Sequence, residues 1–370
     1  MKQNWIYKKL GDVATIKSGK SIGADQIFNF DTSMYPCYGG NGLRGYVQTY
    51  NNEGDMPIIG RVGALCGNVH LSHGKFYATE HALVVKILSN NILAEWLTYC
   101  LKSLNLRRIA KGVAQPVIAA SEVANISIPV PPLPLQQSIV AELDNINNLI
   151  NIKKSQLKDL DNLAQSIFYE MFGDPVENEK GWDVKKLGEV AMIERGAGIS
   201  KKDFVDEGLP CIHYGQLHTI LGELTYKHKT CIPRNLLPKY KIAHPGDVIM
   251  AITSEDVEGS CKSTVWLGNY DVVVGSDAAI VHHSINGIYL TFYTLTKAFY
   301  NEKARYAKGF KVTHISTKEI ESISIPLPPL PLQQKFAEKI EAIEKHKQIV
   351  NVTIKDLETL LASRMQFWFE

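Results

Sequence analysis

The sequence lacks long apolar segments and paired cysteine motifs. No apolar run approaches the roughly 18 residues that a membrane-spanning helix needs. The first ten residues, MKQNWIYKKL, have no apolar core of the kind found in signal peptides. The six cysteines are scattered, and no two of them form a CxxC pair. These absences predict a cytoplasmic protein, because a reducing compartment does not require a disulfide framework.

An excess of one charge is also missing. Lys and Arg number 40 and Asp and Glu number 38, which gives a formal net charge of +2 over 370 residues. Since the whole chain has no basic field, any nucleic-acid site must be a local arrangement. The chain also has no GxxxxGK[ST] phosphate loop, no GxGxxG after a strand and no Asn-Pro-Pro-aromatic or Asp-Pro-Pro-Tyr motif of amino-methyltransferases. We therefore expect no catalysis and no cofactor.

Three groups of residues invite a chemical interpretation, and we interpret all three as structural. Cys66, His70 and His73 have no fourth ligand at a standard zinc spacing, so no metal site is expected. The acids in Ser254-Glu255-Asp256 are assigned to a turn. The pair His282-His283 is assigned to a strand.

An internal duplication is the main feature that the sequence does contain. Residues 126–137 read ISIPVPPLPLQQ, and residues 323–334 read ISIPLPPLPLQQ. The openings of the two halves also match, as KKLGDVA at 8–14 and KKLGEVA at 185–191. The offset between the halves is 177 at these openings and 197 at the proline-rich stretches, so the second half carries an insertion.

The two windows between the shared parts, residues 20–78 and 197–275, have almost no sequence in common. Both are predicted to form strands and tight turns. A hairpin is expected around Gly39-Gly40-Asn41-Gly42, because such a turn needs residues that tolerate positive φ. Strand candidates in and beside the windows are residues 35–38, 43–50, 56–60, 67–71, 81–88, 209–214, 247–253 and 261–267.

The same order of elements follows each window. A helix is predicted at 92–110 and at 288–307, because each segment has a helix-length apolar pattern that stops near a glycine. A short strand is predicted at 123–128 and at 320–325, before each proline-rich stretch. The matching positions of these stretches favour a rigid joint, since proline removes torsional freedom. A PxxP ligand for SH3-like domains is the alternative.

A heptad pattern follows each proline-rich stretch. Apolar residues alternate in steps of four and three from Ile139 to Met171 and from Phe336 to Trp368. This seam predicts a coiled coil of two helices, each about 37 residues and about 55 Å long. Because each helix would begin at its own domain, the second must run antiparallel to the first to bury its seam.

Lys153 interrupts the seam of the first helix, and Lys347 interrupts that of the second. Either they specify the pairing register, or they lie at its edge and extend their ammonium groups to water. The expected fold is α+β, with two globular domains of mixed β-sheet and helices joined by two long helices in an antiparallel, pseudo-twofold coiled coil. The expected boundaries are 1–134 and 173–331 for the domains and 135–172 and 332–370 for the helices.

In this order of parts the chain resembles the specificity subunit of type I restriction-modification systems. The residues that carry the resemblance are Trp5 with Leu10-Gly11-Asp12, Trp182 with Leu187-Gly188-Glu189, both proline-rich stretches, and Met171-Phe172-Gly173-Asp174-Pro175 with Asn178 and Gly181. The resemblance implies two target-recognition domains and helices that act as a spacer and dock two methylase subunits. It also implies a translocase-nuclease subunit as a further partner, and no catalysis by this chain.

Two dissimilar windows on one repeated scaffold suit an asymmetric, bipartite target in duplex DNA, because two inverted readers on a spacer contact two separated half-sites. Two other classes of function remain open. One is a stand-alone nuclease or methyltransferase, which the missing motifs disfavour. The other is a coiled-coil scaffold whose end domains bind proteins, which the near-neutral net charge allows.

Candidates for DNA contact come from the windows and from basic residues near two glycines. Arginine pairs with guanine and Asn or Gln with adenine, whereas basic residues at a helix end either clamp phosphates or cap the helix. For each residue a solvated surface role is the alternative. The candidates are Asn41, Arg44, Arg61, Arg108, Lys111, Gln115, Lys201, Lys202, Tyr214, Gln216, Ser254, Lys262, Arg305, Lys308, Lys311 and His314.

Overall fold

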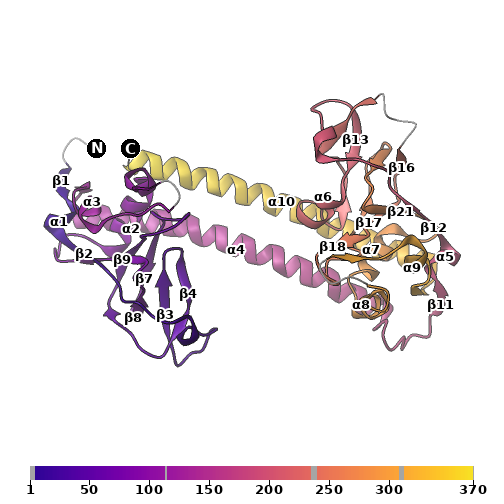
Figure 1. The fold of residues 1–370 in the computed structure, drawn as a ribbon, viewed down its shortest axis with the longest axis horizontal. Coiled ribbons are helices and arrows are strands. Elements are labelled where there is room, and N and C mark those ends of the chain that lie inside the picture. Colours follow the sequence, from indigo (N-terminus) through magenta and orange to yellow (C-terminus); the bar gives the residue numbers. More distant parts are fainter. Residues whose placement is uncertain (1–4, 113–114, 235–239, 308–311, 370) are drawn as a thin grey trace. The chain divides into compact units, whose positions relative to one another are not determined.

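A computed structural model describes residues 5–112, 115–234, 240–307 and 312–369. The chain forms two compact units (Figure 1). Unit 1 contains Met1–Lys154 and Thr353–Glu370, and unit 2 contains Ser155–Val352. Each unit therefore combines a globular domain with part of each of two long helices, α4 (Leu133–Phe172) and α10 (Leu330–Phe369). No helix in the described ranges is long and apolar enough to cross a bilayer.

Unit 1 contains two four-stranded sheets. The first sheet has the order β2 (Ala14–Ser18), β9 (Ala82–Ile87), β6 (Met56–Gly60) and β7 (Val69–Ser72). The second has the order β4 (Gly42–Val47), β3 (Tyr35–Gly39), β8 (Lys75–Ala78) and β5 (Asn52–Glu53). Strands β6 and β9 are rich in buried Ile and Val, which explains why they occupy the centre of the first sheet.

Unit 2 contains a five-stranded sheet and a four-stranded sheet. The first has the order β12 (Ala191–Arg195), β21 (Ala278–His283), β17 (Val248–Ala251), β19 (Ser263–Trp266) and β14 (Leu224–Thr225). The second has the order β15 (Thr230–Ile232), β13 (Leu209–Ile212), β20 (Val272–Val274) and β16 (Lys241–Ala243).

The two units share this topology although their windows differ in sequence. In each second sheet one pair of strands is parallel, with Cys37 opposite Tyr77 in unit 1 and Cys211 opposite Val273 in unit 2. The strand order β2-β9-β6-β7 of unit 1 recurs as β12-β21-β17-β19 in unit 2. The duplication therefore extends through the windows at the level of structure.

Most predicted strands are confirmed, and the β3–β4 hairpin turns at Gly40-Asn41 as expected. The helix predicted at 92–110 is shorter. The observed helix is α2 (Ala94–Ser103), which ends early because Asn105 adopts a left-handed conformation with φ 42°. A 3₁₀ helix, η3 (Leu106–Ile109), follows it. The helix predicted at 288–307 is two helices, α7 (Gly287–Tyr293) and α8 (Lys297–Ala304). Thr296 caps the second of these with its side-chain hydroxyl.

The strands predicted at 123–128 and 320–325 begin later than expected. Their first residues belong to short helices, α3 (Ala120–Ala124) and α9 (Thr317–Glu321). The strands are β10 (Ser127–Val130) and β23 (Ser324–Leu327), which extend into the proline-rich stretches. Each pairs with the opening of its own half, β10 with β1 (Ile6–Lys9) and β23 with β11 (Asp183–Lys186). Proline is tolerated there because both are two-stranded sheets whose strands have a free edge.

Each proline-rich stretch is a strand followed by the first turn of a long helix. The indole Nε1 of Trp96 donates to the carbonyl of Pro129 (3.4 Å), and the hydroxyl of Tyr289 donates to the carbonyl of Pro326 (2.7 Å). Both carbonyls lie at matching positions of the repeat. Both stretches therefore pack against their own domains, while the rigidity of the joint stays a prediction.

The first glutamine of each stretch fixes the helix to the sheet domain. Gln136 is fully buried, and its side chain accepts from Leu93 N (2.9 Å) and donates to the carbonyls of Asn91 and Pro131 (2.8 Å each). In unit 2, Gln333 accepts from Asn286 N (2.9 Å). These bonds place the start of each long helix against the helix that follows the sheets.

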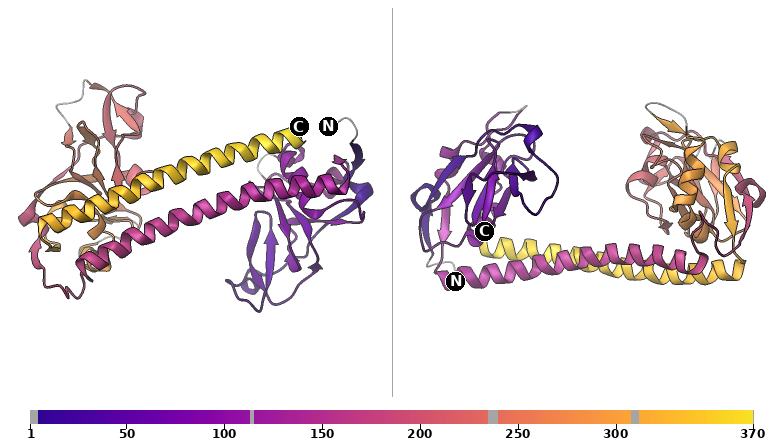
Figure 2. Two further views of the ribbon diagram at one scale, coloured as in Figure 1. Left: turned by 180° about the vertical axis from the view of Figure 1, so that it is seen from behind. Right: turned by 90° about the horizontal axis from the view of Figure 1, so that it is seen from below.

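In unit 1 the end of α10 runs antiparallel to the beginning of α4 (Figure 2). Glu142 accepts from Arg364 and from Trp368 Nε1 (3.1 Å), whereas Lys154 pairs with Glu358 (2.9 Å) further along. Residue numbers thus rise on one helix as they fall on the other. Every predicted seam residue in the two helices is buried or half-buried, which confirms the predicted pairing.

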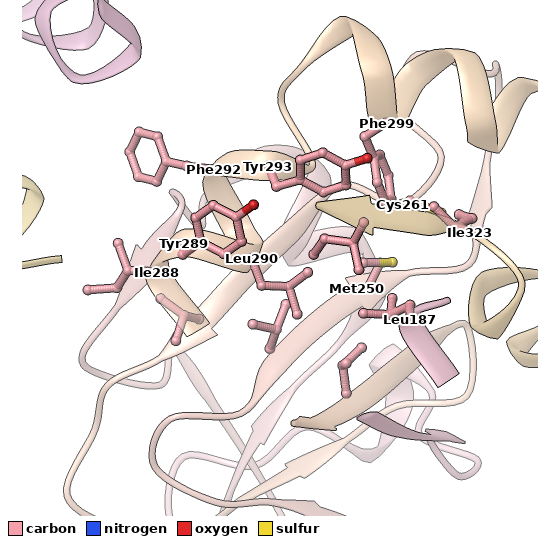
Figure 3. Packing of buried hydrophobic residues seen from close by; sticks show 14 of the residues in the cluster. Leu187, Met250, Cys261, Ile288, Tyr289, Leu290, Phe292, Tyr293, Phe299 and Ile323 are labelled. Carbon is pink, nitrogen blue, oxygen red and sulfur yellow. The ribbon is translucent and has the colours of Figure 1, made fainter. Parts of the chain in front are cut away.

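In unit 2 the beginning of α10 packs on the end of α4 through aromatic rings. Phe336 lies 5.6 Å from Phe168 and 5.2 Å from Phe172 between ring centroids. Tyr289 of α7 stacks on Phe168 at 5.8 Å, so the helices and the sheet domain share one core. Figure 3 shows part of this core, with side chains of α7 beside Met250 and Cys261.

Candidate nucleic-acid interface

A surface groove in unit 1 gathers three of the predicted residues. The β3–β4 hairpin, the loop after β6, His81 and Gln115 enclose a volume of about 680 Å³. Asn41, Arg44 and Gln115 line it with exposed side chains, although Gln115 is distant from the hairpin in sequence. The groove therefore presents an amide, a guanidinium group and a second amide on one surface.

Glycines allow the hairpin to lie directly on the loop after β6. A Cβ added to Gly60 would lie 2.0 Å from the carbonyl oxygen of Gly40, so a side chain there would separate the two segments. Gly42 has φ +88°, and a Cβ on it would lie 2.7 Å from the ring of His70. Burial and the charge of Lys102 lower the pKa of His70. The groove thus has a closely packed, fixed base.

Arg61 is half-buried and directly precedes Val62, which lines the groove. Its backbone N donates to His81 O (2.8 Å), and its carbonyl accepts from Ile118 N (2.9 Å). Its side-chain Nε is buried without a hydrogen-bond partner in the described part of the chain. Arg61 therefore stays a candidate for contact with a ligand of the groove.

The interpretation of Arg108 and Lys111 needs correction, because neither caps a long α-helix. Arg108 lies in η3 and is exposed. Lys111 pairs with Val117 in a β-bridge, and its Nζ contacts Glu122 at 2.6 Å. The hydrogen bond to Glu122 raises the pKa of Lys111. Lys111 thus has a local partner, whereas Arg108 stays a candidate for phosphate contact.

Four predicted residues of unit 2 are brought near Thr253. Strands β18 (Thr253–Ser254) and β22 (Thr313–His314) pair, and Thr253 Oγ1 lies 3.2 Å from His314 Nδ1. The carbonyl of Thr253 contacts His218 Nε2 at 3.1 Å, and Lys262 Nζ donates to His218 O at 3.4 Å. The ring of Tyr214 lies 6.2 Å from that of His218. Ser254, His314, Lys262 and Tyr214 therefore surround one small region.

Gln216 is a second correction, because it does not face outward. It is 7% exposed, accepts from His213 N (2.9 Å) and donates to Thr230 Oγ1 (3.1 Å). It forms the capping box of α6 (Tyr214–Thr219) with His213. Sequence could not separate a capping glutamine from one that reads a base, since both occur in polar turns.

The remaining basic candidates of unit 2 have separate positions. Lys201 and Lys202 are exposed in the 3₁₀ helix η4 (Lys201–Asp203). Burial lowers the pKa of His213, and the charge of Lys201 lowers it further. Arg305 is exposed at the end of α8, and its Nη1 lies 2.5 Å from Glu302 Oε1. Lys308 and Lys311 lie outside the described residues.

Asn68 is a further candidate for DNA contact, and no pattern in the sequence indicated it. Gly67 N donates to Gly60 O, and Gly60 N donates to Asn68 O, both at 2.8 Å. In unit 2 the same two bonds join Cys261 N to Ala251 O and Ala251 N to Lys262 O, again at 2.8 Å. Asn68 therefore occupies the place of Lys262, and its Nδ2 donates to Asn41 Oδ1 (3.3 Å). The loops differ in length, so sequence offset could not reveal this equivalence.

The acidic residues shared by the two units serve local contacts. Asp277 accepts from Arg195 Nη2 (3.2 Å) and from Thr253 Oγ1 (3.4 Å). Glu80 accepts from Ser21 Oγ (3.4 Å).

Among the described residues, no group of three His, Cys, Asp or Glu side chains is placed to hold a metal ion. Of Cys66, His70 and His73, the cysteine is buried, and His73 Nδ1 lies 3.2 Å from Asp55 Oδ1.

Comparison with known proteins places both halves in one family. The family model for the type I restriction modification DNA specificity domain matches residues 2–162 and 179–359. The chain is 40% identical over 146 residues to the EcoprrI specificity subunit of Escherichia coli, which covers 39% of this chain and 36% of that protein. It is 22% identical to the MjaIX specificity subunit of Methanocaldococcus jannaschii, over 99% of this chain and 93% of that protein. The chain thus spans about a third of the first relative and nearly all of the second.

Solved structures share the fold. A type I restriction-modification S subunit from M. genitalium has a TM-score of 0.59 at 15% identity, with 98% of this chain and 95% of that chain covered. A chain from a structural study of assembly and conformational transition in a type I system has a TM-score of 0.57 at 20% identity, with 100% and 98% covered. These likenesses support the arrangement of two domains with two long helices.

Proposed function

Because this chain belongs to the family of type I restriction modification DNA specificity domains, we propose that it directs a type I restriction-modification complex to an asymmetric, bipartite sequence in duplex DNA. Each globular domain reads one half of the target. Methylation and cleavage belong to partner subunits, and this chain supplies no catalytic group. The complex works in the cytoplasm, where its DNA lies.

One observation carries this proposal: the two units have one topology but different surfaces at the same place in it. Unit 1 presents Asn41, Arg44 and Gln115 beside the loop after β6. Unit 2 presents Ser254 in the loop after β17 and His314 on β22, the strand that pairs with this loop. Since the side chains differ where the scaffold is the same, the two half-targets should differ in sequence.

The candidates divide into two roles. Side chains that offer amide, hydroxyl, guanidinium, ammonium or imidazole groups in the groove of unit 1 or around Thr253 of unit 2 suit base edges, because these edges present distinct donors and acceptors in the major groove. Exposed basic residues outside them suit phosphates. The proposed base contacts are Asn41, Arg44, Arg61, Gln115, Tyr214, Ser254, Lys262 and His314. The proposed phosphate contacts are Arg108, Lys201, Lys202 and Arg305.

The two long helices serve the partners. Their antiparallel pairing repeats one helix surface in both units, which suits the docking of two methylase subunits. A restriction translocase-nuclease subunit completes the complex. We propose that the helices also set the number of unread base pairs between the half-targets, since duplex DNA repeats about every 34 Å.

The test is to assemble the chain with its methylase subunit and to sequence the adenines that become methylated. We expect one asymmetric motif with two specified parts. Exchange of residues 1–130 for the corresponding part of another family member should change one part of the motif and leave the other. A continuous or symmetric motif would contradict the proposal. Phosphate contacts make DNA affinity fall steeply as the salt concentration rises. If the affinity of the assembled complex for duplex DNA did not change with salt, the alternative function, a coiled-coil scaffold that binds proteins, would be favoured.

A further inference from the structure

A lysine is buried beneath the connection between β17 and β19, which carries two of the proposed base contacts, Ser254 and Lys262. Lys303 of α8 is 5% exposed. Its Nζ donates to the carbonyls of Glu258 (2.9 Å) and Ser260 (2.6 Å). Both carbonyls belong to the loop of residues 252–260, which forms most of the connection between β17 and β19 and includes the short strand β18. The ammonium group therefore holds the loop backbone from inside the domain.

The loop is fixed at its two ends as well. Its base is closed by the two hydrogen bonds between Ala251 and the pair Cys261-Lys262. Within it, Gly259 N donates to Asp256 Oδ1 and Ser260 Oγ donates to Val257 O, both at 2.7 Å. Ser254 lies at one end of the loop, and Lys262 follows the other. Any shift of the backbone would therefore move both side chains.

A buried ammonium group is costly unless it is paired and hydrogen-bonded. Burial lowers the pKa of Lys303, while the neighbouring Cys261, Glu258 and Asp256 act in the opposite direction. An apolar residue of similar length would fill the same space without that cost. What the lysine adds is a set of directed N–H donors for loop carbonyls that no helix or sheet satisfies.

Unit 1 has a cation in a comparable place. The guanidinium group of Arg107 donates to the carbonyl of Ala64, in the loop that follows β6. A Cβ on Gly67 would lie 2.7 Å from Arg107 N, so this loop lies directly on the segment that carries the arginine. Arg107 is exposed and its loop is shorter. Different cations in the two units thus contact the same loop of the shared topology.

We propose that Lys303 is a positioning residue for sequence recognition: it holds residues 252–260 so that Ser254 and Lys262 face one half of the DNA target. This inference rests on the proposed function of unit 2 as a DNA reader. According to this inference, Lys303 influences which bases are recognised although it lies away from the proposed DNA surface.

The experiment compares Lys303→Met with Lys297→Met in the chain assembled with its methylase subunits. Both lysines lie on α8, but Lys297 is exposed, so it controls for loss of a charge from that helix. A randomised duplex library is methylated, and the methylated adenines are sequenced. One good base contact discriminates roughly 5- to 150-fold. We expect Lys303→Met to lower discrimination at one or more positions of the half-target read by unit 2 by at least about fivefold, with the other half-target unchanged.

A merely structural role would lower the methylation yield at both half-targets equally and leave the motif strict, which would overturn the inference. If Lys303→Met does not fold, Asp256→Ala disturbs the same loop without removing the lysine, because it removes the acceptor of Gly259 N (2.7 Å). Asp256→Ala should relax the same half-target, and a strict motif would again overturn the inference. Failure of the proposed function would be recognised by a different result, because the unchanged chain would then give no bipartite motif.

Discussion

Lys347 of α10 and Asp161 of α4 form an ion pair in unit 2, with 2.8 Å between Nζ and Oδ1. Lys347 occupies a seam position, and Glu344 lies 3.3 Å away on the same helix. Burial lowers the pKa of Lys347, but the hydrogen bond to Asp161 and the charge of Glu344 outweigh it, so that the pKa is raised. Of the two interpretations of this lysine, the one that specifies register is favoured, because the ammonium group has a partner on the opposite helix.

Replacement of the two partners should have unequal effects on stability. Lys347→Met should change the free energy of unfolding by less than about 1 kcal/mol, because methionine packs in an apolar seam. Asp161→Ala should cost more, about 1–2 kcal/mol, because it leaves a half-buried ammonium group without its acceptor across the helices. Urea unfolding followed by circular dichroism measures both. The exposed pair Lys154–Glu358 provides the control, with less than about 0.5 kcal/mol for Lys154→Met. A larger cost for Lys347→Met than for Asp161→Ala would refute this order.

Glu142 should make unit 1 sensitive to acid. The hydrogen bond from Arg364 lowers the pKa of this carboxyl group, burial opposes the shift, and the hydrogen bond from Trp368 adds to it. A pKa lower in the folded than in the unfolded chain stabilises the fold above the unfolded value, around pH 4.3. That stabilisation is lost as the pH falls through the folded pKa. Unfolding midpoints between pH 7 and 3 should therefore fall more steeply for the unchanged chain than for Glu142→Gln. Parallel curves would show that this pair contributes nothing.

Gln136 should matter more to stability than its neighbour. Gln136→Ala leaves Leu93 N and two buried carbonyls without partners, which we expect to cost about 2–3 kcal/mol. Gln137 has the same side chain, lies one residue further along α4 and is exposed, so Gln137→Ala should stay within about 0.5 kcal/mol. Thermal unfolding of the two variants provides the comparison, and equal midpoints would exclude the structural role of Gln136.

Arg44 and Arg108 should affect DNA binding in different ways. Arg44→Ala removes a groove side chain and should relax one position in the half-target read by unit 1, with a loss of about 1–3 kcal/mol of discrimination. Arg108→Ala should leave the motif intact and reduce the slope of log affinity against log salt by about 1, because one phosphate contact is lost. Both residues are exposed, so neither change should alter the unfolding midpoint measurably. A relaxed motif for Arg108→Ala would reverse the two assignments.

Local and periodic patterns made several elements predictable. The β3–β4 hairpin was predictable because Gly-Gly-Asn-Gly favours a tight turn whatever surrounds it. The helix at 92–110 was predicted too long, since an apolar pattern does not show that Asn105 turns left-handed or that Thr296 caps a new helix in the other half. Apolar periodicity locates a helix better than it locates the ends of a helix.

The candidate site was predictable only in part. Asn41 and Arg44 were predicted because they lie on a recognisable turn, and both line the groove of unit 1. Gln216 was misassigned and Asn68 was missed, because hydrogen bonds to residues distant in sequence decide which polar side chain faces inward. Those partners differ between the windows, so no pattern within either window identifies them.

By itself, the sequence determined the duplication, the seam of the coiled coil and the absence of motifs for catalysis, because these depend on repetition and on short-range periodicity. Only the tertiary structure decided that the two dissimilar windows have one strand order, and that Trp5 and Trp368 share one core. It also decided that Lys303 holds the loop of unit 2 from within. The physical reason is that strand pairing and burial join residues far apart in the chain, and many different sequences satisfy the same contacts.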